Sequence, residues 1–243
     1  MRLRDELEGI YAILLKDLKA YYLKPPNISW GILFPIVLAL AFTLRNPRGL
    51  RDLAPGLVAM AALFGTTSME AIVVTFEKRV GALERLYMAP LTYASILLAK
   101  VLGGAVFGGF ISAVMTLLCV TLLGMHISHP LLYVGGLALS LIALSSLGSL
   151  IAFSVREVFE AQTFSNYFRF PMIFLCGVFI PVGSLPLPLR VVAYMLPLTY
   201  TVELLRSSTL SPSTCPLLDL AILILFSTVF LLLTHRAMGR AYG

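Results

Sequence analysis

The sequence predicts an all-α membrane protein with six transmembrane helices, forming one domain over residues 1–243. Its mean hydropathy is +0.93 and 12% of its residues are charged, whereas a soluble domain carries roughly 25%. Several apolar runs reach the roughly 20 residues that a helix needs to cross the bilayer core. Because backbone polar groups find no water in that core, we expect these runs to be helices.

The pattern of apolar and charged residues in 1–24 predicts an amphipathic helix that lies in the membrane interface. Apolar residues recur there at helical spacing, and charged residues fall largely between them. An ordinary surface helix packed on the bundle is the alternative. Pro25-Pro26 would end the helix and turn the chain into the bilayer. The apolar positions are Leu7, Ile10, Tyr11, Leu14, Leu15, Leu18 and Tyr22.

The six spans follow from the apolar runs between charged or proline-containing breaks. Some runs exceed the length needed to cross, so we expect tilted helices or ends outside the hydrocarbon. The predicted spans are 28–44, 53–76, 96–123, 131–153, about 163–180 and 217–235.

The distribution of basic residues predicts the orientation. With the N-terminus inside, the inner segments hold thirteen Lys and Arg and the outer segments hold five. Since basic residues are enriched in cytoplasmic loops, we expect a multi-pass protein of the cell membrane with both termini in the cytoplasm.

A charged island, residues 77–90, separates the second and third predicted spans. Five charges fall within the nine residues from Glu77 to Arg85, and the only other charges between Leu53 and Val155 are Glu70 and Lys100. The spacing of Val80, Leu83 and Tyr87 on one face predicts a short amphipathic cytoplasmic helix, which Pro90 ends. It could bind a partner or lie on lipid headgroups without one.

The segment 181–206 is the predicted outer connection before the last span. It is rich in proline yet apolar, so we expect proline-broken re-entrant helices that dip into the outer leaflet. A plain structured outer loop is the alternative.

Three polar residues are expected inside the membrane: Glu70, Asn166 and Arg169. Buried charge is costly there, so Glu70 should face the bundle, pair with an opposite charge or be neutral. Glu70 could be a pathway or coupling residue, or a satisfied structural acid. Arg169 could partner Glu70 or meet an anionic group of a substrate.

Several function classes are disfavoured by the sequence. The net charge of +6 suits cytoplasmic loops, and no loop has the dense basic tract that would favour nucleic acid. The three cysteines show no metal-ligand spacing, so we expect no metal site. An intramembrane hydrolase would need a base near a nucleophile such as Ser149, but no histidine lies in the middle of a predicted span. An ion-coupled carrier or channel, with few intramembrane charges to support it, remains the main alternative to the function given below.

Two blocks of sequence resemble the permeases of the ABC-2 type transporter family, in particular the small daunorubicin-resistance and nodulation exporters. The resemblance covers nearly the whole chain in order and spacing. Cys176 stands where the family often has a serine. The first block is Phe76-Glu77-Lys78-Arg79, Gly81, Leu83-Glu84-Arg85-Leu86, Ala89-Pro90-Leu91, Ile96-Leu97 and Lys100. The second is Pro171, Phe174-Leu175, Gly177, Phe179, Pro181, Leu185-Pro186, Leu196-Pro197-Leu198-Thr199-Tyr200 and Leu205-Arg206.

The resemblance implies a type V ABC exporter fold in which residues 77–90 form a coupling helix seated in an ATP-binding subunit. The N-terminal helix would contact the same subunit, and residues 181–206 would close the exit side. The implied coupling residues are Glu77, Lys78, Arg79, Gly81, Leu83, Glu84, Arg85, Leu86 and Pro90. The implied outer residues are Gly177, Pro181, Pro186, Pro197, Leu198, Thr199 and Tyr200.

The implied function is the permease subunit of an ATP-driven exporter of a hydrophobic or amphipathic substrate, such as a drug, a lipid or a lipid-linked glycan. The chain has no G-x-x-x-x-G-K-[ST] sequence, so it is not expected to bind nucleotide phosphates through a P-loop. ATP and Mg²⁺ would then belong to a separate subunit, of which two copies are expected. The resemblance also implies a second permease chain, expected to be a homodimer partner, and no cofactor or catalytic residue in this chain.

Overall fold

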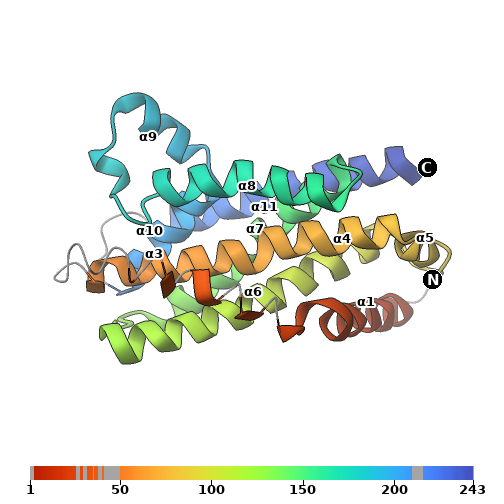
Figure 1. Ribbon diagram of the computed structural model, residues 1–243, viewed down its shortest axis with the longest axis horizontal. Helices are drawn as coiled ribbons and strands as arrows, with labels where there is room; N and C mark the ends of the chain where they lie inside the picture. Colours follow the sequence, from red (N-terminus) through yellow and green to blue (C-terminus); the bar gives the residue numbers. More distant parts are fainter. Residues whose placement is uncertain are drawn as a thin grey trace.

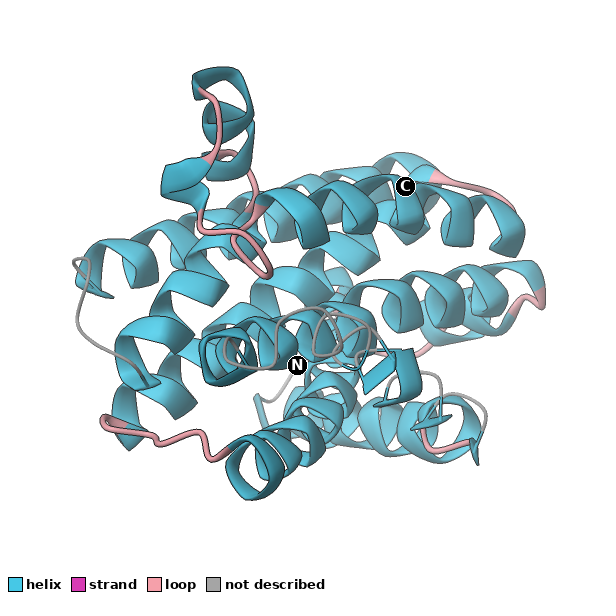
Figure 2. Cartoon of the chain, turned by 60° about the vertical axis from the view of Figure 1, so that its left-hand side comes forward, coloured by secondary structure: helices cyan, strands magenta, loops and turns pink. Residues whose placement is uncertain are grey.

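The computed structural model describes residues 3–25, 28–29, 32–34, 36–37, 40, 50–209 and 216–242, and these residues form helices and short connections without a strand (Figures 1 and 2). The long helices run roughly along one direction and make an elongated bundle (Figure 1). An all-helical chain is therefore confirmed for the described residues. The first predicted span, 28–44, lies mostly outside them.

The helices follow one another with short breaks. The N-terminal helix α1 (Leu3–Asp17) continues into a π-helical turn, Leu18–Tyr22. Then come α3 (Leu50–Leu63), a π-helical turn (Phe64–Ser68), α4 (Met69–Arg79), α5 (Ala82–Tyr87), α6 (Tyr93–Leu123), α7 (Pro130–Ser154) and α8 (Val158–Leu175). A 3₁₀ turn (Val182–Ser184), α9 (Leu187–Tyr194), α10 (Pro197–Thr209) and α11 (Pro216–Tyr242) complete the described chain.

Four of the predicted spans coincide with helices long and apolar enough to cross a membrane. These are Asp52–Arg79, Tyr93–Leu123, Pro130–Ser154 and Pro216–Gly239. The first of them is continuous through α3, the π-helical turn and α4. Helix α8 occupies the region of the fifth predicted span, but it begins at Val158 and ends at Leu175, five residues before the expected end at Ile180.

Helix α7 lies at the centre of the bundle, where it packs against α6, α4, α10 and α11. Hydroxyl groups add bonds between helices: Thr67 donates to the Leu144 carbonyl at 3.1 Å and Ser145 donates to the Val101 carbonyl at 2.8 Å. Glycine permits close approach of helices, because a Cβ atom on Gly65 would lie only 2.9 Å from the Cα atom of Gly108 on α6. Small residues and interhelical hydroxyl bonds are the usual means of packing helices where water provides no driving force.

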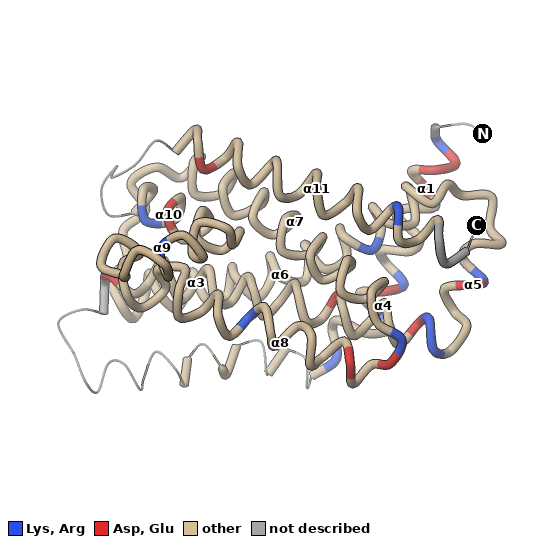
Figure 3. The backbone as a smooth tube through the Cα atoms, turned by 90° about the horizontal axis from the view of Figure 1, so that it is seen from above, with Lys and Arg blue, Asp and Glu red and all other residues tan. Residues whose placement is uncertain are grey.

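Charged residues gather at the two ends of the bundle, with few between them (Figure 3). One end carries α1, α5 and the C-terminal part of α11, and we call it the α5 end (Figure 1). The opposite end carries α9 and the start of α3, and we call it the α9 end. Between them, α6 and α11 expose leucines such as Leu117 and Leu232. This distribution is typical of helices in contact with lipid.

Candidate functional site

The charged island is not a single helix. Helix α4 continues through Arg79, and Gly81 adopts φ +66° before the short helix α5 begins at Ala82. A positive φ is unfavourable for residues with a Cβ atom, so glycine marks the break. The prediction of one exposed helix over 77–90 is therefore wrong in its boundaries: the last turn of α4 belongs to the bundle, and only α5 and the residues after it project from it.

Glu77 is fully buried in that last turn and takes part in a cluster of four charges. Its carboxylate accepts hydrogen bonds from Lys16 of α1, at 2.6 Å, and from Lys100 of α6. Asp17 of α1 completes the cluster, lying 2.7 Å from the Lys100 ammonium and 3.0 Å from that of Lys16. Two acids and two bases balance, which is the condition under which buried charges are tolerated.

The two charges that α1 contributes have shifted pKa values. Burial acts to lower the pKa of Lys16, but its hydrogen bond to Glu77 and the negative charges of Asp17 and Glu77 outweigh burial and raise it above 10.5. Burial raises the pKa of Asp17, which the Lys100 ammonium opposes. The Lys16 ammonium is therefore held in its charged form.

The next two residues of α4 hold other helices. The Lys78 ammonium donates to the carbonyl oxygens of Ala152, at 2.9 Å, and Val155, at 2.8 Å, at the end of α7. The Arg79 guanidinium lies 3.4 Å from the carboxylate of Glu157, which precedes α8. We call Glu77, Lys78 and Arg79 the α4 hub, because through them one helical turn is bonded to α1, α6, the end of α7 and the start of α8.

Helix α5 presents the charges that remain accessible. Leu83 is buried in a cluster with Ile13 of α1 and Ile96 of α6, which fixes the helix on the bundle. Glu84 and Arg85 point outward and are exposed. Nearby, Leu86 is half-buried, and Met88 and Pro90 are exposed. Glu77, Lys78 and Leu83 thus face the bundle. The predicted coupling residues that remain exposed are Arg79, Glu84, Arg85 and Pro90, with Leu86 half-buried.

Helix α1 docks on α6 beside this surface. Its buried or half-buried side includes Glu6, Ile13 and Asp17, and Glu6 accepts a hydrogen bond from Ser95 of α6 at 3.0 Å. Leu7 and Tyr11 are exposed on its other side. The helix therefore packs on the bundle, as the alternative description has it, and still exposes an apolar strip; its location in the membrane interface stays a prediction. The acidic position Asp17 within the docking side could not be recognised from periodicity.

Glu70 is fully buried between three elements. Its carboxylate accepts hydrogen bonds from the Tyr22 hydroxyl and, at 2.8 Å, from the Ser149 hydroxyl of α7. Glu70 is thus a satisfied acid that ties the end of the N-terminal helix to the bundle. The expected pairing with Arg169 is not observed.

Arg169 lies elsewhere, on the buried side of α8. Its guanidinium donates to the Asn166 side-chain oxygen at 2.7 Å and stacks 4.2 Å from the centre of the Phe64 ring. No carboxylate of the described residues lies within 4.0 Å of it. Asn166 and Arg169 therefore form a local pair within one helix, as their spacing of three residues allows.

The predicted outer residues lie at the α9 end. Gly177 adopts φ +84°, and its carbonyl oxygen accepts a bond from Arg206 at 2.6 Å. Thr199 donates to the Ala193 carbonyl at 2.5 Å, and Tyr200 donates to that of Tyr194 at 2.7 Å. Proline starts or precedes each short helix, with Pro181 before the 3₁₀ turn, Pro186 before α9 and Pro197 opening α10, where Leu198 is buried.

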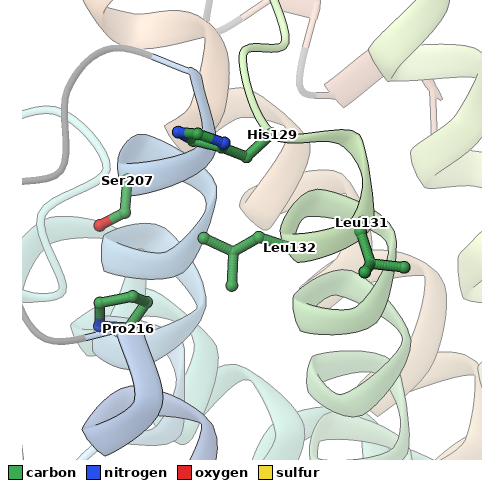
Figure 4. A pocket seen from close by; sticks show the side chains of 5 residues that line it. All are labelled: His129, Leu131, Leu132, Ser207 and Pro216. Atoms are coloured by element: carbon green, nitrogen blue, oxygen red, sulfur yellow. The ribbon is translucent and has the colours of Figure 1, made fainter.

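A cavity of about 360 Å³ also opens at the α9 end, between the start of α7 and the facing parts of α10 and α11 (Figure 4). His129, Leu131, Leu132, Ser207 and Pro216 line it. The lining is mainly apolar and brings no acid–base pair together, so we place no chemistry there.

Comparison with known proteins assigns this arrangement to a family. The family model for ABC-2 type transporters matches residues 8–210, so the chain belongs to the ABC-2 type transporter family of membrane proteins. The resemblance read from the two sequence blocks is therefore confirmed. The chain is 29% identical over 167 residues to "Probable multidrug ABC transporter permease YbhS" of Escherichia coli K12, and equally to the protein of that name in Escherichia coli O157:H7. The match covers 67% of this chain and 44% of each relative, so the chain spans less than half the length of the relatives it matches.

Proposed function

We propose that the chain is a permease subunit of an ATP-driven exporter in the cell membrane, and that α5 receives the motion of a separate ATP-binding subunit. Family membership supports the class of protein. The observation that carries the coupling role is the position of α5: it projects at one end of the bundle with Glu84 and Arg85 exposed, while its buried Leu83 and the adjoining α4 hub fix it to the bundle.

Two copies of the ATP-binding subunit and a second copy of this chain complete the proposed assembly. The chain contains no P-loop sequence, so hydrolysis of ATP is assigned to the partner, along with its Mg²⁺. Closing of the ATP-binding pair would shift α5 between two positions, a two-state change biased by nucleotide. Both termini would lie in the cytoplasm, since α1 and the end of α11 share the α5 end (Figure 1).

The proposed cargo is a hydrophobic or amphipathic molecule. The relatives carry the word "multidrug" in their names, and four helices of the described residues are long and apolar enough to cross a membrane. The outer segment 181–206, with its short proline-bounded helices, is the proposed closure on the exit side.

Co-purification with an ATP-binding subunit tests the coupling surface. The E84A/R85A variant should lose the subunit, because it removes the exposed charges of α5 and leaves Leu83 in place. The matched control is D52N/H126Q, which changes two exposed residues at the α9 end and should retain it. Normal assembly of E84A/R85A would contradict the role of α5, and transport driven by an ion gradient without any ATP-binding subunit would contradict the whole proposal.

A further inference from the structure

The junction between α7 and α8 is held by the α4 hub. Helix α7 ends at Ser154, Val155 is extended, and α8 begins at Val158. The last carbonyl groups of a helix have no donor within it, and here the Lys78 ammonium supplies one to Ala152 and Val155. The same ammonium lies 5.4 Å from the centre of the Phe153 ring. A cation at a helix C-terminus is favoured by the helix dipole as well.

The start of α8 is bonded to the adjacent residue of the hub. Glu157 caps α8: its side chain accepts from the backbone of Glu160, and the Glu160 side chain accepts from the Glu157 backbone N–H at 3.2 Å. Arg79 lies 3.4 Å from Glu157 on the other side. Two consecutive residues of α4 therefore hold the end of one long helix and the beginning of the next.

Helix α5 leaves α4 at the same place. Only Val80 and Gly81 separate Arg79 from Ala82, so a force applied to α5 acts directly on the last turn of α4. We propose that Lys78 is a positioning residue that transmits a displacement of α5 to the α7–α8 junction, and so to α8. This inference rests on the proposed function, in which an ATP-binding subunit moves α5.

Lys78 is better suited to this role than Arg79. The Arg79–Glu157 pair is exposed, so water and salt screen it and its two long side chains can yield. Lys78 is half-buried, and its acceptors are backbone oxygens that move with α7 itself. Lys78 is not the partner of any buried carboxylate, because both of its acceptors are backbone carbonyl oxygens. Its replacement therefore does not create an unpaired buried charge.

The experiment measures nucleotide-driven movement in the assembled complex with its ATP-binding subunit. Spin labels are placed at M88C after α5 and at F159C in α8, each paired with L102C on α6, in a background with Cys119, Cys176 and Cys215 replaced by serine. Electron–electron distance distributions are recorded without nucleotide and with ATP, Mg²⁺ and vanadate. The variants are K78M, which removes the donor at similar length, K78R, which keeps a cation, and K24M, which changes an exposed lysine at the end of the N-terminal helix.

In K78M, the distance between the labels at Met88 and Leu102 should change with nucleotide as in the wild type. For the labels at Phe159 and Leu102, the factor by which nucleotide changes the ratio of the two distance populations should fall about tenfold, which is within the usual range of coupling between sites. K78R should recover the shift at Phe159, and K24M should not alter it. A Phe159 shift that is unchanged in K78M overturns the inference. Loss of both shifts in K78M also overturns it, because the effect of Lys78 would then be on α5 alone and not on transmission to α8. If K78M does not assemble, K78Q is measured by the same criteria. Failure of the proposed function looks different: the wild type would show no shift at Met88.

Discussion

Glu77 and Lys100 are two fully buried charges held together between α4 and α6, with Lys16 and Asp17 of α1 completing the cluster. Each charge has at least one partner of opposite charge, and this attraction offsets part of the free energy that desolvation costs. The cluster joins residues 61 and 83 positions apart in the chain. Its effect is to fix the N-terminal helix against the end of the second predicted span.

Removing one member of this cluster should cost more than removing a matched pair. K100M leaves the two buried carboxylates of Glu77 and Asp17 with a single ammonium, that of Lys16, and we expect it to lower the free energy of unfolding by about 3–5 kcal/mol. K100M/E77Q should lose less than the sum of the two single variants, because the second change removes an unpaired charge. Thermal unfolding of the purified protein in detergent measures all three, and strict additivity would contradict the cluster.

The raised pKa of Lys16 leads us to expect a loss of stability at high pH. Its pKa is raised in the folded state above the ordinary 10.5, so its contribution is complete below 10.5 and is lost as the pH rises through the folded value. The midpoint of thermal unfolding of the wild type should therefore fall relative to that of K16M as the pH is raised above 10.5. Parallel curves for the two proteins between pH 9 and 12 would show that the ammonium makes no such contribution.

Val80 and Gly81 separate α5 from α4, and of the two only Gly81 lies in the left-handed region. Gly81 has φ +66°, and a Cβ atom added there would meet only the Glu84 carboxylate, at 3.8 Å. The cost of a substitution thus comes from the backbone and not from crowding. This makes Gly81 a sensitive point for the placement of the coupling surface.

G81A should destabilise the protein by about 1–2 kcal/mol, the cost of the left-handed conformation for a residue with a Cβ atom. It should also weaken retention of the ATP-binding subunit, because α5 would leave α4 at a different angle. The matched control is G135A in α7, where an added Cβ atom meets nothing within 4 Å and helix propensity should leave stability equal or up to about 1 kcal/mol higher. Equal behaviour of the two variants would show that the turn at Gly81 is not required.

The helices that the sequence predicted well are those marked by long apolar runs, since run length against bilayer thickness is a strong signal. The helix boundaries within the charged island were harder to predict, because Val80, Leu83 and Tyr87 keep helical spacing although the helix breaks at Gly81. Lys16, a partner of Glu77, and Tyr22, a partner of Glu70, could not be predicted, since both contacts depend on how the N-terminal helix docks. That docking is set by tertiary contacts among residues far apart in the chain.

At the scale of the whole molecule, charged residues gather at the two ends of the bundle (Figure 3). Between them, exposed leucines such as Leu117 and Leu232 lie on α6 and α11. Helices α1 and α5 and the last turns of α11 share one end, and α9 lies at the other (Figure 1). Both ends of the described chain thus lie on one side of the bundle. That this side faces the cytoplasm stays a prediction from the basic residues, and it is open to a direct test.

A membrane-impermeant maleimide should distinguish the two ends in intact cells. M88C at the α5 end should react only after the membrane is permeabilised, whereas H126C at the α9 end should react without permeabilisation. Both positions are exposed, so access and not burial decides the result. The reverse pattern would invert the proposed orientation and place α5 out of reach of any cytoplasmic ATP-binding subunit.

The division of the island at Gly81 has a consequence for engineering chimeric transporters. An exchange of residues 77–90 with those of another permease would replace the partner-facing surface, but it would also remove Glu77 and Lys78 from their contacts with α1, α6 and α7. An exchange of residues 82–90 would alter the surface and leave those contacts intact. The natural boundary of a transplantable recognition module therefore lies just after Gly81, inside what reads as one continuous motif.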